Sequence, residues 1–312
     1  MRSFKTFKTD KRSPLGAAHR RSARFFVLFI TVCTLAMAFA PTASAAAEVA
    51  AVSESISFPE GSAAVNITLD GRRILDGRAA IINSVTYVPL REFSELAGAD
   101  SVKWNASTRT ASVTYRGVTM YVTDGAFFVN ALGRYFYTVE KVLNINGRLF
   151  VPIRALSKVF SIEVGWDAAT RTAVLKRTNK TFASASAYYN SDDLYWLSRI
   201  INAEAGGESF AGQIAVGNVV LNRRAHPSYP NTVWGVIFDR RGGTQFTPVA
   251  IGTIYRTPSE SAVIAAKVCL EGYSVSEDAL FFMNPRIATS NWISRNCKFL
   301  FSLGNHDFYG LK

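Results

Sequence analysis

Cysteine and histidine are scarce in this 312-residue chain, which contains three of each. Three cysteines exclude a disulfide-stapled scaffold, and so few histidines leave a protein-built metal site short of ligands. Long apolar runs are equally rare: after residue 40 nothing approaches the about 18–20 residues that a membrane span needs. Aromatic residues are plentiful, with 22 Phe, 12 Tyr and 5 Trp, and 48% of the chain is apolar. This composition excludes a disordered protein, and the length suggests two domains.

The formal net charge of +12 comes mostly from the N-terminus, where residues 1–24 hold eight Lys or Arg and one acid. An apolar run over residues 25–40 follows, and then the small-residue sequence Ala43-Ser44-Ala45. We expect a secretory signal over residues 1–45 that is cleaved near Ala45, with an uncleaved anchor as the alternative. The protein is then secreted or held in the cell wall, and its basic charge does not indicate a nucleic-acid partner.

Residues 54–178 contain short alternating segments typical of strands, at residues 85–90, 111–115 and 118–122. They also contain an internal repeat. The segment Tyr87-Val-Pro-Leu-Arg91 recurs as Phe150-Val-Pro-Ile-Arg154, and Trp104-Asn-Ala-Ser-Thr-Arg-Thr110 recurs as Trp166-Asp-Ala-Ala-Thr-Arg-Thr172. Each copy predicts a strand, a helix started by proline, a strand with tryptophan, a turn and a strand. Asn105 or Asp167 would supply the side chain that stabilises the turn.

These repeated segments resemble the copper amine oxidase N-terminal-like (stalk) domain over about 120 residues. The resemblance implies an accessory domain, with a wall polymer as its ligand or a role as a spacer. Residues 54–178 contain no His and no Cys, so nothing in them suggests copper chemistry. We expect Arg91 and Arg154 to make structural hydrogen bonds. Small and polar residues at 179–190 indicate a linker to a second domain, residues 191–312.

The second domain begins with a helix whose apolar row ends in a carboxylate. Asn190 and the two acids that follow Ser191 are typical of a helix start. Leu197 and Ile201 share one face, and Glu204 continues that face just before Gly206. Burial at this position would raise the pKa of Glu204, as a general acid requires, whereas a head group that reaches water would be inert.

Two further helices are predicted, one from Ser209 to Arg223 and one from Thr257 to Leu270. Thr257-Pro258-Ser259-Glu260 reads as a capping box with proline at the first helical position. Aromatic and polar residues are mixed after Gly272, which suits either a carbohydrate cleft or ordinary loop packing. Cys269 and Cys297 would either form one disulfide or stay buried as thiols.

A set of motifs occurs in order along this domain: Ala203-Glu-Ala-Gly-Gly-Glu208, Gly212-Gln-Ile-Ala-Val-Gly-Asn-Val-Val-Leu-Asn-Arg223, Pro230-Asn-Thr-Val-Trp234, Gln245-Phe-Thr247, Asn284-Pro285, Ala288-Thr-Ser-Asn-Trp-Ile293 and Gly304-Asn-His306. Together they resemble the SleB-type cell wall hydrolase family, which includes spore cortex-lytic enzymes. The overall expectation is a multidomain α+β protein, in which a β-rich, two-copy stalk precedes a mainly helical, lysozyme-like catalytic domain.

The resemblance implies that Glu204 is catalytic and that the substrate is the glycan strand of peptidoglycan. The family reaction is lytic transglycosylation of the bond from N-acetylmuramic acid to N-acetylglucosamine, without a cofactor or metal. Phe281 and Phe282 stand where the family often has Tyr, so a hydroxyl contact is missing or comes from elsewhere. Hydrolysis would need a second carboxylate, for which Glu208 is the candidate. We expect Glu208 instead to order the loop after the helix, by pairing with Arg223 or by capping the next helix.

The residues expected to bind or position substrate are Glu208, Gln245, Thr247, Phe282, Asn284, Ser290, Trp292 and His306. The alternatives to a lytic transglycosylase are a zinc N-acetylmuramoyl-L-alanine amidase and a non-catalytic wall-binding protein. For the amidase, His226 and His306 are too few and too far apart in the sequence to form a recognised zinc motif. We expect a monomer that acts on vegetative wall or, during germination, on spore cortex.

Overall fold

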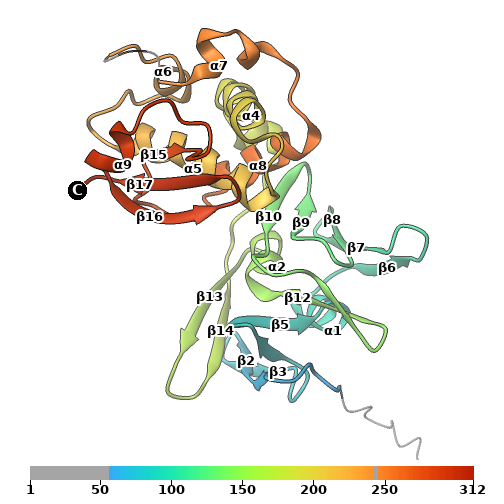
Figure 1. Ribbon diagram of the computed structural model, residues 1–312. Helices are drawn as coiled ribbons and strands as arrows, with labels where there is room; N and C mark the ends of the chain where they lie inside the picture. The colour runs from blue at the N-terminus through green and yellow to red at the C-terminus, as the bar shows by residue number, and fades with distance from the viewer. Residues whose placement is uncertain (1–55, 242, 244) are drawn as a thin grey trace, which may run out of the picture. The chain divides into compact units, whose positions relative to one another are not determined.

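The computed structural model describes residues 56–241, 243 and 245–312, which belong to one compact unit (Figure 1). The secretory signal predicted over residues 1–45 lies outside the described residues. Within the part that is described, no helix is both long and apolar enough to cross a membrane.

The region up to residue 178 is rich in β-strands, as the sequence predicts. Its elements are β1 (Ala63–Ala64), β2 (Asn66–Leu69), β3 (Arg72–Ile74), β4 (Ala80–Ile82), β5 (Val85–Pro89), α1 (Leu90–Ala97), β6 (Ser101–Asn105), β7 (Thr110–Tyr115), β8 (Val118–Thr123), β9 (Phe128–Ala131), β10 (Arg134–Tyr137), β11 (Leu143–Ile145), β12 (Arg148–Pro152), α2 (Ile153–Val159), β13 (Ile162–Asp167) and β14 (Thr172–Arg177). The three segments predicted as strands coincide with β5, β7 and β8.

The internal repeat is visible in the fold as β5–α1–β6–β7 and β12–α2–β13–β14. In both turns the predicted side chain accepts backbone hydrogen bonds, Asn105 from Ser107 and Asp167 from Ala169. The prolines lie one position earlier than predicted. Pro89 and Pro152 are the N-cap residues of α1 and α2 rather than their first helical residues, because each proline still closes its strand.

The two copies pair with each other through their repeated strands. β5 and β12 run antiparallel with Val88 opposite Val151, so equivalent residues meet, as in a two-fold arrangement. This pair lies inside a sheet of order β1-β4-β5-β12-β11, beside sheets of order β10-β9-β8-β7-β6 and β13-β14-β2-β3.

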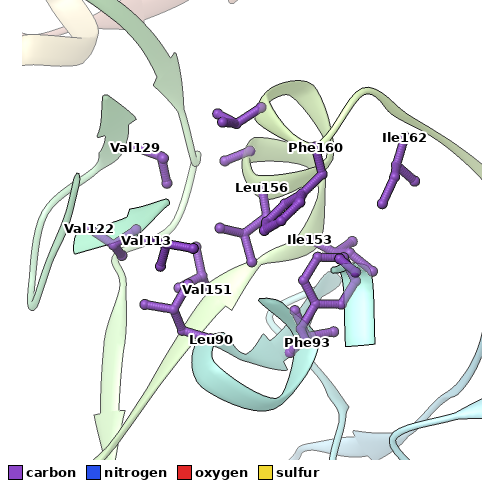
Figure 2. Packing of buried hydrophobic residues seen from close by; sticks show 14 of the residues in the cluster. Leu90, Phe93, Val113, Val122, Val129, Val151, Ile153, Leu156, Phe160 and Ile162 are labelled. Atoms are coloured by element: carbon purple, nitrogen blue, oxygen red, sulfur yellow. The ribbon is translucent and has the colours of Figure 1, made fainter. Parts of the chain in front are cut away.

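Both repeat helices direct apolar side chains into one shared core (Figure 2). Phe93 from α1 meets Phe160, the residue that ends α2, edge to face at 5.7 Å between ring centroids. Residues from the strands, including Val113, Val122, Val129 and Val151, complete this core. Side chains alternate between the two faces of each strand, and each short helix has one apolar side, so every element buries one face in this core. The repeat pattern predicts this arrangement.

The segment 179–190 was predicted as a linker, and it contains one helical turn, α3 (Ala185–Tyr188). The backbone N–H of Ala185 donates to the carbonyl of Leu132, and the hydroxyl of Tyr189 donates to Glu271. Glu271 also accepts two hydrogen bonds of 2.7 Å from Arg134. The segment is therefore tied down by contacts that its polar composition does not reveal.

The C-terminal domain is mainly helical. Its elements are α4 (Ser191–Ala205), α5 (Phe210–Ala225), α6 (Val233–Ile237), α7 (Thr247–Ala250), η1 (Thr253–Tyr255), α8 (Glu260–Leu270), β15 (Phe281–Met283), α9 (Trp292–Asn296), β16 (Lys298–Leu303) and β17 (His306–Gly310). Asn190 caps α4 as predicted, since its side chain accepts from Asp192 and Asp193. The third helix begins later than predicted. Ser259 caps α8 by accepting from Ala262, and Thr257 and Pro258 precede the helix.

Helices α4, α5 and α8 pack closely around Gly217 of α5. A Cβ at Gly217 would lie 2.8 Å from both the Ile201 side chain and the Cys269 sulfur, so this close approach requires glycine. The aromatic segment near residue 281, which was not predicted as a strand, forms β15 in a small sheet of order β15-β17-β16. This sheet brings the C-terminal motif residues back to the loop that follows α4.

Candidate active site

Glu204 lies in the last turn of α4, on the same face as Leu197 and Ile201, which are fully buried. Burial raises the pKa of the Glu204 carboxyl from 4.5 to about 7 by desolvation, which disfavours the charged form. Within the described part of the chain, no hydrogen bond or ion pair holds this carboxyl group. Glu204 is therefore free to carry a proton near neutral pH and to give it up, which is what a general acid does.

Glu208 lies four residues further on, and its environment has the opposite effect. Its carboxylate accepts hydrogen bonds from the backbone N–H and the side-chain amide of Asn305, at 3.1 and 2.8 Å. These bonds, chiefly the one from the side chain, lower the pKa of Glu208. The pKa values of the two glutamates are thus shifted in opposite directions, which favours the protonated form of Glu204 and the ionised form of Glu208. This pattern separates acid and base roles in glycosidases.

Gly304 makes this contact sterically feasible. Its φ of +61° is left-handed, and a Cβ at this position would lie 2.1 Å from a carboxylate oxygen of Glu208. Two of the roles predicted for Glu208 are wrong. Glu208 does not cap the next helix, because Ser209 caps α5, and it does not pair with Arg223, which donates to the carbonyl of Leu280 instead. Glu208 does order its loop, through a residue 97 positions away that helical or strand spacing could not predict.

His306 lies beside Glu208, with its Nδ1 3.9 Å from a Glu208 oxygen. The imidazole is buried, its Nδ1 has no hydrogen-bond partner among the described residues, and desolvation lowers its pKa. Its ring meets Phe282 of β15 edge to face at 5.3 Å, and Phe282 in turn lies 6.3 Å from Phe246. A neutral histidine and two phenylalanine rings thus form one wall.

Arg223 of α5 extends this wall, and we did not predict its position. Its buried guanidinium donates from Nε to the carbonyl of Leu280 at 2.7 Å and lies 5.2–5.3 Å from the ring centroids of Tyr229, Phe246 and Phe281. Desolvation lowers its pKa. A buried cation held by rings and carbonyls is costly and hard to infer from sequence, because its partners come from three separate segments.

The remaining predicted residues lie at different distances from this wall. Gln245 lies 3.5 Å from Arg223 and accepts from it. The exposed ring of Trp292 lies 6.2 Å from Phe281. Asn284 and Ser290 use their side chains in local turns, accepting from Arg286 and Trp292, and Thr247 is an exposed residue at the start of α7.

The structure therefore brings Glu208, His306, Phe282, Gln245 and Trp292 into one chain of contacts. Ser290 joins this chain only through its local hydrogen bond from the Trp292 backbone, and among the described residues no side-chain contact links Thr247 or Asn284 to it. A cavity of about 790 Å³ lies elsewhere in this domain, between α5 and the C-terminal strands, and Glu204 does not line it. The candidate site rests on the burial of Glu204 and on the contact chain rather than on a closed pocket.

The two cysteines of this domain are buried free thiols, which decides between the two alternatives left open by the sequence. Burial raises the pKa of Cys269, and its sulfur donates to the carbonyl of Ile214. Among the residues that the structure describes, no three His, Cys, Asp or Glu side chains gather as they would around a metal ion.

Comparison with known proteins places these features in two families. A family model described as "Cell Wall Hydrolase" matches residues 207–309, and one described as "Copper amine oxidase N-terminal domain" matches residues 68–175. Curated relatives named "Spore cortex-lytic enzyme" are 43% identical over 105 residues in Bacillus cereus and 38% identical over 121 residues in Bacillus subtilis. The matches cover 34% and 39% of this chain, and the chain spans 39% of the length of each relative.

Two solved structures are also similar in sequence. One is the catalytic domain of the germination-specific lytic transglycosylase SleB from Bacillus anthracis, with 40% identity, a TM-score of 0.36 and coverage of 39% of this chain and 96% of that one. The other is the catalytic domain of the Bacillus cereus SleB protein, with 38% identity, a TM-score of 0.35 and coverage of 43% and 97%. Through its C-terminal domain the chain belongs to the cell wall hydrolase family, and a copper amine oxidase N-terminal-like domain precedes that domain.

Proposed function

We propose that this protein is an exported lytic transglycosylase that cleaves peptidoglycan between N-acetylmuramic acid and N-acetylglucosamine. The observation that carries the proposal is the contrast between Glu204, in the last turn of α4, and Glu208, in the loop that follows. Glu204 has a pKa raised to about 7 by burial, whereas Glu208 is held ionised by Asn305. The named relatives, which are spore cortex-lytic enzymes, support the choice of substrate.

In the proposed reaction, protonated Glu204 donates its proton to the glycosidic oxygen as the C1–O bond breaks through an oxocarbenium-like state. The Glu204 carboxylate then removes the proton of the muramic C6 hydroxyl, whose oxygen attacks C1 and closes a 1,6-anhydro ring. The proton taken from C6–OH restores the acid, and no water is consumed. A single carboxylate suffices, so Glu208 can remain in its structural contact with Asn305.

Glu208 and His306 would position this chemistry rather than perform it. Their contact ties the loop after α4 to β17, and the buried ring of His306 leads to Phe282. We expect the rings of this wall, with Trp292 at its exposed end, to lie against the apolar faces of sugars. Arg223 would hold the wall together, since Phe246 and Phe281 both lie against its guanidinium.

The test is mass spectrometry of the products released from purified peptidoglycan and from spore cortex by the chain and by Glu204→Gln. Anhydro-muramic ends that the variant no longer releases would support the proposal, and the substrate that is cleaved faster would distinguish wall from cortex. Reducing muramic ends would mean hydrolysis, with Glu208 as the second carboxylate. Free stem peptides that a chelator abolishes and Glu204→Gln leaves unchanged would favour the amidase instead.

A further inference from the structure

The two copies of the repeat each border a cavity, and the two cavities share a set of equivalent wall residues. The second cavity is also lined by residues 136–139 and 271–273, which have no counterpart in the first. In the first copy, a cavity of about 230 Å³ is lined by Arg91, Trp104 and Ala111 among others. In the second, a cavity of about 570 Å³ is lined by Arg154, Trp166 and Ala173. These are the same positions of the repeat, so the duplication preserved a cavity as well as a fold.

The strands build both cavities in the same way. Trp104 lies opposite Ala111 across β6 and β7, and Trp166 lies opposite Ala173 across β13 and β14. A small residue opposite a large ring leaves open space beside the ring. The tryptophans are 45% and 46% exposed. Neither indole is therefore needed to fill the core, and both leave part of the ring accessible at equivalent positions beside a cavity.

Some polar groups that line the second cavity have no hydrogen-bond or ion-pair partner among the described residues. Arg91 of the first copy donates to the carbonyl of Val102 at 3.1 Å, which confirms its predicted structural role. Arg154 has no such partner among the described residues, and Lys158 lines the same cavity. Thr138 also lines it, and its hydroxyl is buried without a hydrogen-bond partner in the described structure. An unpartnered buried hydroxyl beside an unpaired cation calls for a ligand with both hydroxyls and negative charge.

We propose that these two cavities are equivalent binding sites for an acidic polysaccharide, with the second copy binding more tightly. The indole takes the apolar face of a pyranose ring, Thr138 bonds a sugar hydroxyl, and Arg154 faces a carboxylate or phosphate group. Residues 54–178 contain 15 Lys or Arg against 11 Asp or Glu, a balance that also favours an anionic polymer. The choice of a wall glycan rests on the proposed function, whereas the sites themselves do not.

Binding is best tested with the chain carrying Glu204→Gln, so that cleavage cannot interfere. Sedimentation with insoluble peptidoglycan, with and without its phosphate-bearing polymers, measures affinity. We expect Trp166→Ala to weaken binding about tenfold and Trp104→Ala about threefold. The double variant should lose up to about thirtyfold, the product of the two single effects, because two sites on one chain that hold one polymer contribute multiplicatively to its affinity. Arg154→Gln should weaken binding to the charged polymer and make it less dependent on salt.

Tyr121→Ala is the matched control, because Tyr121 is an equally exposed ring of β8 that lines neither cavity. Binding that persists after removal of the phosphate polymers would identify the glycan carboxylates as the ligand, and binding lost with them would identify phosphate. Unchanged binding by the double variant, or an equal loss in Tyr121→Ala, would overturn the proposal. Cleavage of soluble glycan fragments by Trp104→Ala/Trp166→Ala in the active chain tests the proposed function separately, and we expect it to persist.

Discussion

The repeat region and the C-terminal domain treat their charged groups in opposite ways. In the repeat region, Asp70 and Asp167 have pKa values lowered by hydrogen bonds at the surface, and the buried Arg134 is paired with Glu271. In the C-terminal domain, Glu204 is half-buried and its carboxyl group has no hydrogen bond or ion pair among the described residues. His306 is buried 3.9 Å from Glu208, with no hydrogen bond to its Nδ1, and Arg223 is buried among rings. Among the described residues, Glu204 is the one carboxyl group whose pKa is raised.

This contrast shows where the molecule departs from the arrangement that is best for stability. Buried charged groups without a partner are costly, and groups of this kind gather at functional sites more often than elsewhere. The repeat region satisfies its turn residues Asn105 and Asp167 locally, and it contains two cavities lined by repeated residues. Reactivity and recognition are therefore expected in different parts of the chain.

Among the substitutions that test this comparison, Glu204→Gln should have the largest effect on the rate of cleavage. Loss of the general acid is expected to lower the rate of product release by a factor of about 10²–10⁴, which is what such groups contribute. Activity of the parent chain should also fall as the pH rises above about 7, because the carboxyl group that donates the proton becomes ionised. The measurement is the rate of muropeptide release between pH 5 and 9. A variant with more than a tenth of the parent rate would contradict the assignment.

Leu156→Ala tests whether the stability of the repeat region can be lowered without a loss of catalytic rate. Leu156 is fully buried in the core shared by α1 and α2, so its truncation should cost about 3 kcal/mol of unfolding free energy. The rate on soluble fragments should stay the same where the variant remains folded. Denaturant unfolding together with an activity assay at low temperature measures both. A large loss of rate in fully folded protein would show that the two regions are not separable.

Gly304→Ala should have a smaller effect than Leu156→Ala on stability but a visible one on activity. The added Cβ collides with the Glu208 carboxylate, so we expect about a tenfold loss of rate as the loop shifts. Gly252→Ala is the control: Gly252 has a similar φ of +76°, and a Cβ there meets no atom within 4 Å. Both variants carry the backbone strain, of about 1 kcal/mol, and only Gly304→Ala should slow the reaction. Equal rates in the two variants would remove Glu208 from the positioning role.

The smallest effect is a gain of stability in Glu204→Gln at alkaline pH. Because folding raises the pKa of Glu204 from 4.5 to about 7, its favourable protonated form is lost as pH rises through 7, and the folded state is then destabilised. Replacing it with neutral Gln should raise the unfolding free energy at pH 8 by on the order of 2 kcal/mol and change it little at pH 4. Thermal unfolding of the parent chain and the variant at pH 8 and at pH 4 measures this difference in stability. An equal change at both would show that the carboxyl is not desolvated.

Local spacing along the chain was enough to predict the repeat, the turn residues Asn105 and Asp167, the cap Asn190 and the position of Glu204 on a buried helix face. Each of these depends on contacts within about one or two turns of backbone, where side-chain choice and conformation are directly coupled. Errors of one or two residues arose at Pro89 and Thr257, where two local signals competed for one helix start.

Only the tertiary structure decided which distant residues meet. It joined Glu208 to Asn305, surrounded Arg223 with rings from three segments, kept Cys269 and Cys297 apart as thiols and paired β5 with β12. Such contacts depend on how loops close and on which of several possible hydrogen-bond partners the fold brings close. No spacing along the sequence encodes that choice. The position of Glu204 was thus determined by a helix face, and its surroundings by the fold.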